Sequence, residues 1–185
     1  VETRIHELDR DRLAKIEKGV RRHHGMDEQN AGLCALIPDG GLAVPLVAKT
    51  RSSVLRALVD LADQCGLVWA RDELLREVRE REDLCTTALV AGCALPHPRY
   101  PLEWDIAESF VVVGLTERGV PFGCPTGELT RLFFLICCKD DRTHLHVLAR
   151  VGQLLHAPAV REDLVIAETP EQLRERIAVH DLTLR

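Results

Sequence analysis

Apolar side chains recur along the chain with the periods of helices and of buried strands. Residues 52–64 have apolar positions every three or four residues, as does the segment 71–81, and this spacing predicts an amphipathic helix in each. A further helix is expected over residues 143–155 on the same grounds. Two shorter helices follow, and Thr169 is expected to cap the last of them, with Pro170 at its first position.

Between these helices lie short runs that are almost wholly apolar. Residues 87–95, 110–115 and 132–138 are such runs, and this character is typical of strands covered on both faces. A short strand over residues 42–47 contains Pro45, which favours a position at the edge of the sheet. The sequence therefore predicts an α/β fold in which helices flank a mixed β-sheet on both faces, a three-layer α/β sandwich.

The N-terminal segment differs from the rest of the chain in charge. Its first thirty residues contain seven acidic and seven basic side chains, so the net charge of -5 belongs to the remainder. A helix is expected over residues 8–22, followed by a linker over residues 25–40. We therefore divide the chain into an N-terminal helix and linker, residues 1–34, and an α/β domain, residues 35–185.

Composition and charge exclude several classes of protein. With 185 residues, 46% of them hydrophobic, the chain is too apolar to be disordered. No apolar run approaches the ~18 residues of a membrane span, and no secretory signal peptide is visible, so we expect no membrane insertion and a cytoplasmic location. The acidic balance disfavours direct nucleic-acid binding, because phosphate contact requires a basic surface.

Seven cysteines stand at irregular spacings with no Cys-x-x-Cys pair. An odd number cannot all form disulfides, and the simplest interpretation is free thiols buried in a reduced interior. A zinc site is the alternative, and its candidate ligands are Cys124, Cys137, Cys138, His144 and His146. Neighbouring strand residues point to opposite faces, so Cys137 and Cys138 are not expected to share a metal. We expect neither a metal nor a cofactor.

Three residues are candidates for chemistry. His97 lies between two prolines where a buried strand ends, and the stiff backbone there suits a nucleophile. Arg81 continues the apolar stripe of its helix, where a buried cation would need an anion beside it. The alternative is that its side chain reaches water at the end of the helix. His144 lies on the apolar stripe of its helix and His146 on the opposite one. A histidine beside an arginine indicates phosphoryl transfer, with three ordinary structural residues as the alternative.

Four segments resemble the enzyme IIA domain of the bacterial phosphotransferase system, of the fructose, mannitol and nitrogen-regulatory type. They are Lys49–Arg51 with the helix that begins there, Arg81–Thr87, Gly92–His97 and Thr143–Arg150. By this resemblance His97 is identified as the phosphoryl acceptor, Arg81 as the residue that stabilises the phosphoryl charge, and His144 as the second active-site histidine.

The resemblance also implies a function and partners. It implies a phosphohistidine phosphotransferase component that is loaded by an HPr-like phosphocarrier protein. The phosphoryl group then passes to a IIB domain, or the loaded state acts as a signal on a regulatory target protein. In the family this transfer needs no metal, because positioning and charge stabilisation suffice.

The sequence departs from the family pattern just before His97. Where the family usually has Thr-Gly-Ile-Gly-x-Gly, this chain has Ala88 and Val90 at the first two glycine positions, and Pro98 follows the histidine. If those positions need a positive φ, the loop has to differ here. The alternative function is therefore a non-catalytic module of the same fold that binds a partner or an anion. The extra N-terminal residues suggest the tail of an upstream helix-turn-helix domain.

Overall fold

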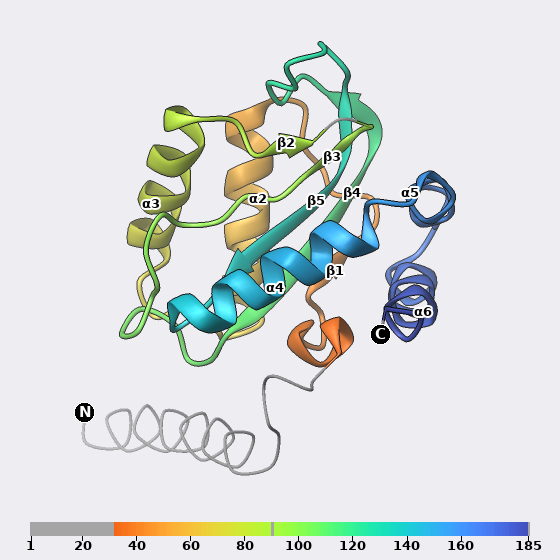
Figure 1. Ribbon diagram of the computed structural model, residues 1–185. Helices are drawn as coiled ribbons and strands as arrows, with labels where there is room; N and C mark the ends of the chain where they lie inside the picture. The colour runs from red at the N-terminus through yellow and green to blue at the C-terminus, as the bar shows by residue number, and fades with distance from the viewer. Residues whose placement is uncertain (1–31, 90, 185) are drawn as a thin grey trace, which may run out of the picture. The chain divides into compact units, whose positions relative to one another are not determined.

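The computed structural model describes residues 32–89 and 91–184, in which two helices precede four consecutive strands and three helices follow them (Figure 1). The helical elements are η1 (Leu33–Leu36, a 3-10 turn), α2 (Arg51–Gln64), α3 (Arg71–Leu84), α4 (Asp141–Leu154), α5 (Pro158–Val165) and α6 (Pro170–Asp181). The strands are β1 (Leu42–Ala43), β2 (Ala88–Leu89), β3 (Cys93–Ala94), β4 (Phe110–Val120) and β5 (Thr130–Cys137). The predicted helix over residues 8–22, and the predicted linker as far as residue 31, lie outside the described residues.

The five strands form one mixed sheet, which confirms that prediction. Their order is β1-β4-β5-β3-β2. Strands β4 and β5 are antiparallel, whereas β1 is parallel to β4 and β3 is parallel to β5. Because β3 and β5 are parallel, their carboxyl ends meet at the same edge of the sheet.

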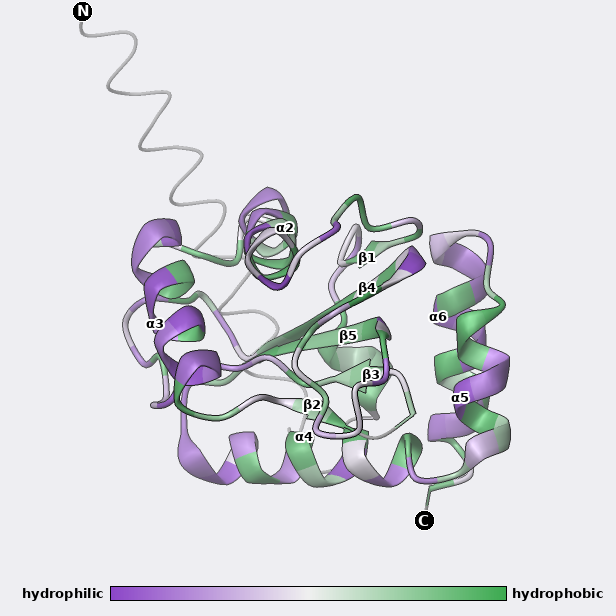
Figure 2. Ribbon diagram, turned by 90° about the horizontal axis from the view of Figure 1, so that it is seen from above, coloured by the Kyte–Doolittle hydropathy of each residue, from purple (hydrophilic) through white to green (hydrophobic). Residues whose placement is uncertain are grey.

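Helices cover both faces of the sheet, so the predicted three-layer arrangement is correct (Figure 2). Along β4, Phe110 and Val112 belong to the core beneath α2 and α3, whereas Val111 and Val113 belong to the core beneath α4. This alternation is the period of two of a pleated strand, and it explains why the central strands are apolar at every position. Helices α5 and α6 pack against each other, and α6 also contacts β1 and η1.

The segment 87–95 differs from the single strand predicted for it. It forms a hairpin in which β2 pairs antiparallel with β3. The chain reverses because Ala91 and Gly92 adopt φ values of 75° and 77°, in the left-handed region. Ala88 lies in β2 without a positive φ, so alanine at this family glycine position needs no unusual backbone. Val90, at the other such position, lies outside the described residues.

Two further strands differ in length from their predictions. Strand β4 continues to Val120, beyond the predicted strand over residues 110–115, with an irregular register between Leu115 and Val120. Strand β1 lies at the sheet edge as predicted but contains only two residues. Proline has no N–H to donate, and Pro45 follows the strand closely.

The helices agree with their predicted positions to within three residues at either end. Helix α3 runs three residues past its predicted end, and Thr169 caps α6, with its side chain accepting from the Gln172 N–H. Within the described residues no helix is long and apolar enough to cross a membrane.

All seven cysteines are free thiols. Four of them are buried as expected, namely Cys93, Cys124, Cys137 and Cys138. Burial raises the pKa of Cys93 to about 11, so that thiol is protonated at neutral pH. Cys85 is exposed, contrary to the general expectation, because it follows directly after the last residue of α3.

A buried carboxylate joins the two ends of the described unit. Asp181, at the end of α6, accepts hydrogen bonds from the Leu33 backbone N–H at 2.6 Å and from Arg150 Nε of α4 at 2.5 Å. A Cβ on Gly32 would stand 2.7 Å from the Asp181 Oδ2 atom, so glycine permits this close approach. The boundary predicted between residues 34 and 35 stays a prediction, although Leu33 is already fully buried in the core.

Candidate functional site

His97 is held in a defined orientation just beyond β3. The chain stays extended there, and the Pro96 carbonyl accepts a hydrogen bond from Ile136 of β5 at 3.0 Å. The His97 Nδ1 atom lies 2.7 Å from the Leu95 carbonyl oxygen. A carbonyl oxygen can only accept, so the ring proton resides on Nδ1 and donates to it. The Nε2 atom is then left with a lone pair, which is the condition for a nucleophile.

His144 lies beside His97 although 47 positions separate them in the sequence. Helix α4 begins directly after β5, with Asp140 as its N-cap, and His144 is in its first turn. The centroids of the two imidazole rings are 5.1 Å apart, with an angle of 55° between the ring planes. The parallel β3–β5 pair causes this proximity, because His97 follows one strand and His144 the next. His146, two positions further along α4, is exposed.

Arg81 occupies the last turn of α3 and is half-buried. Its Nη1 donates to the Cys85 carbonyl at 2.8 Å, which is the helix-end role that the sequence left open. Its positive charge also lowers the pKa of both His97 and His144, so the guanidinium lies within electrostatic reach of the two rings. The structure therefore brings all three predicted site residues into one corner of the domain.

The electrostatics of the corner keep the His97 ring neutral at neutral pH. Burial, assisted by the charges of Arg81 and His144 and opposed by the Leu95 hydrogen bond, lowers the pKa of His97 to about 4. Burial also lowers the pKa of His144, with Asp141 opposing and Arg81 assisting. At neutral pH both imidazoles are thus uncharged, while the arginine supplies the positive charge that a phosphoryl group needs.

Glu82 is a residue of this corner to which sequence reasoning assigned no role. It is only 1% exposed, and its two carboxylate oxygens accept from the Thr87 N–H at 2.9 Å and the Thr87 hydroxyl at 2.5 Å. The apolar stripe of α3 contains a signal for it, because Glu82 follows Leu74 and Val78 at intervals of four. The sequence analysis placed Arg81 on that stripe, whereas the structure buries the neighbouring residue, Glu82.

The residues considered for zinc are divided between layers. Cys137 belongs to the core beneath α2 and α3, and Cys138 to the core beneath α4, as the strand period predicts. Across residues 32–89 and 91–184, no three His, Cys, Asp or Glu side chains are grouped as metal ligands.

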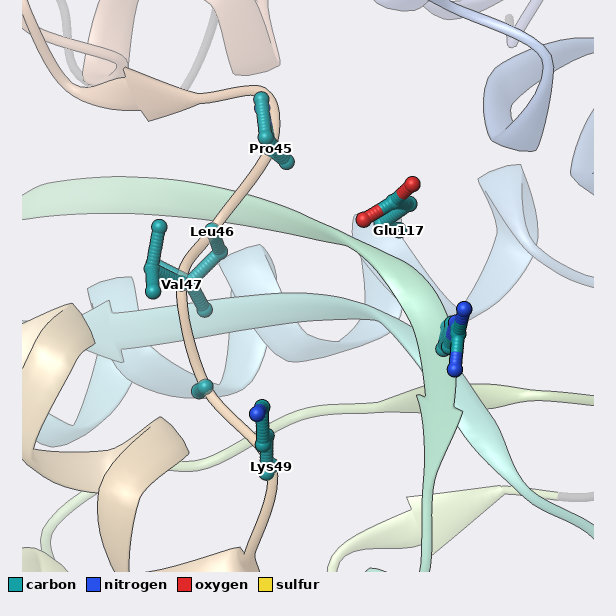
Figure 3. Close-up of a pocket in the computed structure, with 7 residues that line it drawn as sticks. Pro45, Leu46, Val47, Lys49 and Glu117 are labelled. Atoms are coloured by element: carbon teal, nitrogen blue, oxygen red, sulfur yellow. The ribbon is translucent and has the colours of Figure 1, made fainter.

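A separate pocket of about 380 Å³ lies beside the β1 edge (Figure 3). Its lining consists of the segment from Pro45 to Lys49 together with Glu117 and Arg118 of β4. It contains none of the three predicted site residues. The candidate site lies at the histidine pair instead, because the two imidazole rings lie side by side there and Arg81 lowers the pKa of both.

Known proteins are similar to this chain over most of the described unit. Residues 39–179 match the family model described as "Phosphoenolpyruvate-dependent sugar phosphotransferase system, EIIA 2". The fructose-specific EIIABC component of Bacillus subtilis is 25% identical over 136 residues, which is 72% of this chain and 21% of that protein. The chain therefore spans about a fifth of the length of that relative.

Two more similarities concern shorter proteins. The fructose-specific EIIA component of Haloferax volcanii is 27% identical over 70% of this chain and 83% of its own length. The structure of enzyme IIA mannitol of Escherichia coli, solved in a complex with phosphorylated enzyme IIB mannitol, superimposes with a TM-score of 0.67. That match covers 76% of this chain and 95% of the other at 21% identity, and it shows that the fold is the same.

Proposed function

The chain belongs to the EIIA 2 family of the phosphoenolpyruvate-dependent sugar phosphotransferase system, and from that membership we propose that it carries a phosphoryl group on Nε2 of His97. The observation that carries the proposal is the hydrogen bond from Nδ1 to the Leu95 carbonyl at 2.7 Å. This bond leaves Nε2 as the nitrogen with a free lone pair, and the low pKa of the ring keeps it unprotonated at neutral pH.

The transfer step is a displacement at phosphorus. The Nε2 lone pair of His97 forms a bond to the phosphorus of a donor phosphohistidine, and the phosphorus–nitrogen bond of the donor breaks, with its electron pair returning to the donor nitrogen. Arg81 stabilises the charge on the phosphoryl oxygens, and His144 lies close enough to hydrogen-bond to them. The proton on His97 Nδ1 stays on that nitrogen throughout and remains hydrogen-bonded to the Leu95 carbonyl.

The partners follow from the same proposal. The donor is a phosphocarrier protein of the HPr type, and the acceptor is a IIB domain or a regulatory target protein. The complex of the Escherichia coli IIA and IIB mannitol domains supports the IIB alternative, because that IIA domain has the same fold. Such an exchange takes place in the cytoplasm, where phosphoenolpyruvate is available.

The test is intact-mass measurement after incubation with phosphoenolpyruvate and the two upstream proteins. Wild-type protein should gain one acid-labile phosphoryl group, and His97→Ala should gain none. The matched control is His146→Ala, which removes an exposed histidine of α4 and should label like wild type.

Two results would contradict the proposal. Equal labelling of wild type and His97→Ala would show that the acceptor lies elsewhere. Reversible binding of inorganic phosphate without any covalent labelling of wild type would favour the non-catalytic module instead.

A further inference from the structure

We propose that Glu82 is a positioning residue for His97, acting through Thr87 and Leu95. The inference rests on the proposed function, since it concerns the atom of His97 that accepts the phosphoryl group. It is carried by a continuous series of hydrogen bonds that begins in the core and ends at the imidazole ring.

The series begins at the buried carboxylate. Glu82 Oε1 accepts from the Thr87 N–H at 2.9 Å and Oε2 accepts from the Thr87 hydroxyl at 2.5 Å. Both residues are buried, at 1% and 7% exposed, so neither bond competes with water. Two bonds from one residue to the two oxygens of one carboxylate fix Thr87 against the last turn of α3.

The series continues through the backbone to the ring. The Thr87 carbonyl accepts from the Leu95 N–H at 3.1 Å, and the Leu95 carbonyl accepts from His97 Nδ1 at 2.7 Å. The Leu95 peptide is therefore held on one side by Thr87 and holds the imidazole on the other. Its carbonyl direction determines which ring nitrogen carries the proton, and that choice leaves Nε2 free to react.

The residue type at position 82 suits this task. A carboxylate offers two acceptor oxygens, and Thr87 offers two donors, a backbone N–H and a hydroxyl. An apolar side chain of similar size would fill the same space but would leave both donors without this acceptor. A buried acid is costly to keep where packing is the only requirement. The geometry thus assigns Glu82 a role beyond filling the core.

The experiment measures the ring protonation directly. In Glu82→Leu, which removes both acceptors while filling the core, the ¹⁵N chemical shifts of His97 should move from a single Nδ1–H form toward a mixture of tautomers. Phosphoryl loading should slow roughly tenfold, because the nucleophile is misplaced part of the time. Glu82→Gln keeps an acceptor for the N–H and a donor for the hydroxyl oxygen, and should load within about twofold of wild type.

The matched control is Glu80→Leu, which removes an exposed carboxylate from the same helix. Its tautomer and loading rate should equal those of wild type. If Glu82→Leu does not fold, Thr87→Val replaces it, since this variant loses only the hydroxyl bond and should shift the tautomer in the same direction. Thr87→Ser should restore the wild-type value.

Either of two outcomes would overturn the inference. One is a wild-type tautomer and loading rate in Glu82→Leu, or in Thr87→Val where that variant is used instead. The other is an equal slowing in Glu82→Leu and Glu80→Leu. The ¹⁵N measurement needs no phosphoryl donor, so it decides the role of Glu82 even if wild-type protein proves not to be labelled.

Discussion

Glu82 and Asp181 are both buried carboxylates, but they accept hydrogen bonds from different parts of the domain. Each accepts a backbone N–H, from Thr87 and from Leu33 respectively. The second partner of Glu82 is a neutral hydroxyl, whereas the second partner of Asp181 is the Arg150 guanidinium. Removing one partner of a buried charged pair leaves an uncompensated charge, and this costs more than the loss of a neutral hydroxyl partner.

The difference lies in what each hydrogen bond leads to. From Asp181 the bonds lead to η1 and α4, and so join elements that are far apart in the sequence. From Glu82 they lead through two backbone links to the ring of His97. We therefore expect substitutions at the Asp181 corner to change the free energy of unfolding, and substitutions at the His97 corner to change the rate of phosphoryl loading.

The largest effect is expected from Asp181→Ala. The substitution leaves the buried Leu33 N–H and the half-buried Arg150 without their carboxylate, and should reduce the free energy of unfolding by about 3 kcal/mol. Urea denaturation measures this change. The loading rate per folded molecule should stay at the wild-type value, and a large loss of rate would show that the two corners are coupled through α4.

Arg81→Ala should slow phosphoryl loading by about 10², because a positive charge near the developing phosphoryl charge is removed. Rapid-quench measurement of labelling gives the rate. The rate of Arg81→Lys should lie between those of wild type and Arg81→Ala, because lysine keeps the charge but not the planar guanidinium. If Arg81→Ala is slowed no more than a nearby exposed arginine such as Arg76→Ala, the role of Arg81 is limited to its hydrogen bond with Cys85.

Acidic pH should lower the stability of the domain through the low pKa of His97. Burial lowers the pKa of this ring from 6.5 to about 4. As the pH falls from 6.5 to about 4, the unfolded chain binds a proton there and the folded chain does not, so stability falls with the pH over that range. His97→Gln should remove this part of the pH dependence, which denaturation at several pH values would measure. An unchanged slope in the variant would contradict the low pKa.

Wild-type loading should likewise fall once the pH passes below about 4, because Nε2 is then protonated. A rate profile that bends near the ordinary value of 6.5 instead would mean that the ring is more exposed to water than the structure indicates.

The smallest effect is expected from Ala91→Gly. Ala91 has a φ of 75°, which costs an alanine about 1 kcal/mol relative to glycine. The variant should therefore be more stable by up to that amount, partly offset by the greater freedom of glycine in the unfolded chain. Thermal unfolding measures the change, and Ala35→Gly at an exposed position without positive φ serves as the control that should not gain stability.

Local patterns were sufficient for the helices and for the central strands. The apolar runs near Phe110 and Leu132 predicted two buried strands, and the apolar period of residues 52–64 predicted α2, because both depend on side chains that are close in sequence. The hairpin of β2 and β3 was missed because its reversal depends on Ala91 as well as Gly92, and alanine does not normally mark a turn.

The candidate site was predicted only in its reactive residues. Residue types and positions made His97, Arg81 and His144 candidates, the family resemblance gave each a role, and the structure places them together. The contribution of Glu82 was not identified, because a glutamate one position from an arginine near a helix end is usually solvent-exposed. Its burial goes with the Thr87 N–H and hydroxyl that its two oxygens accept from, a contact made only in the folded chain.

The amino-acid sequence by itself determined the positions of the main helices and central strands, the covering of the sheet on both faces, and the choice of His97, Arg81 and His144 as candidate site residues. These properties depend on side-chain chemistry and on short-range periodicity. Only the tertiary structure decided that β3 and β5 lie parallel, which brings His97 and His144 to one edge. It also decided that Glu82 is buried against Thr87 and that the His97 ring hydrogen-bonds to the Leu95 carbonyl, because burial and side-chain direction depend on packing that the local residue pattern does not reveal.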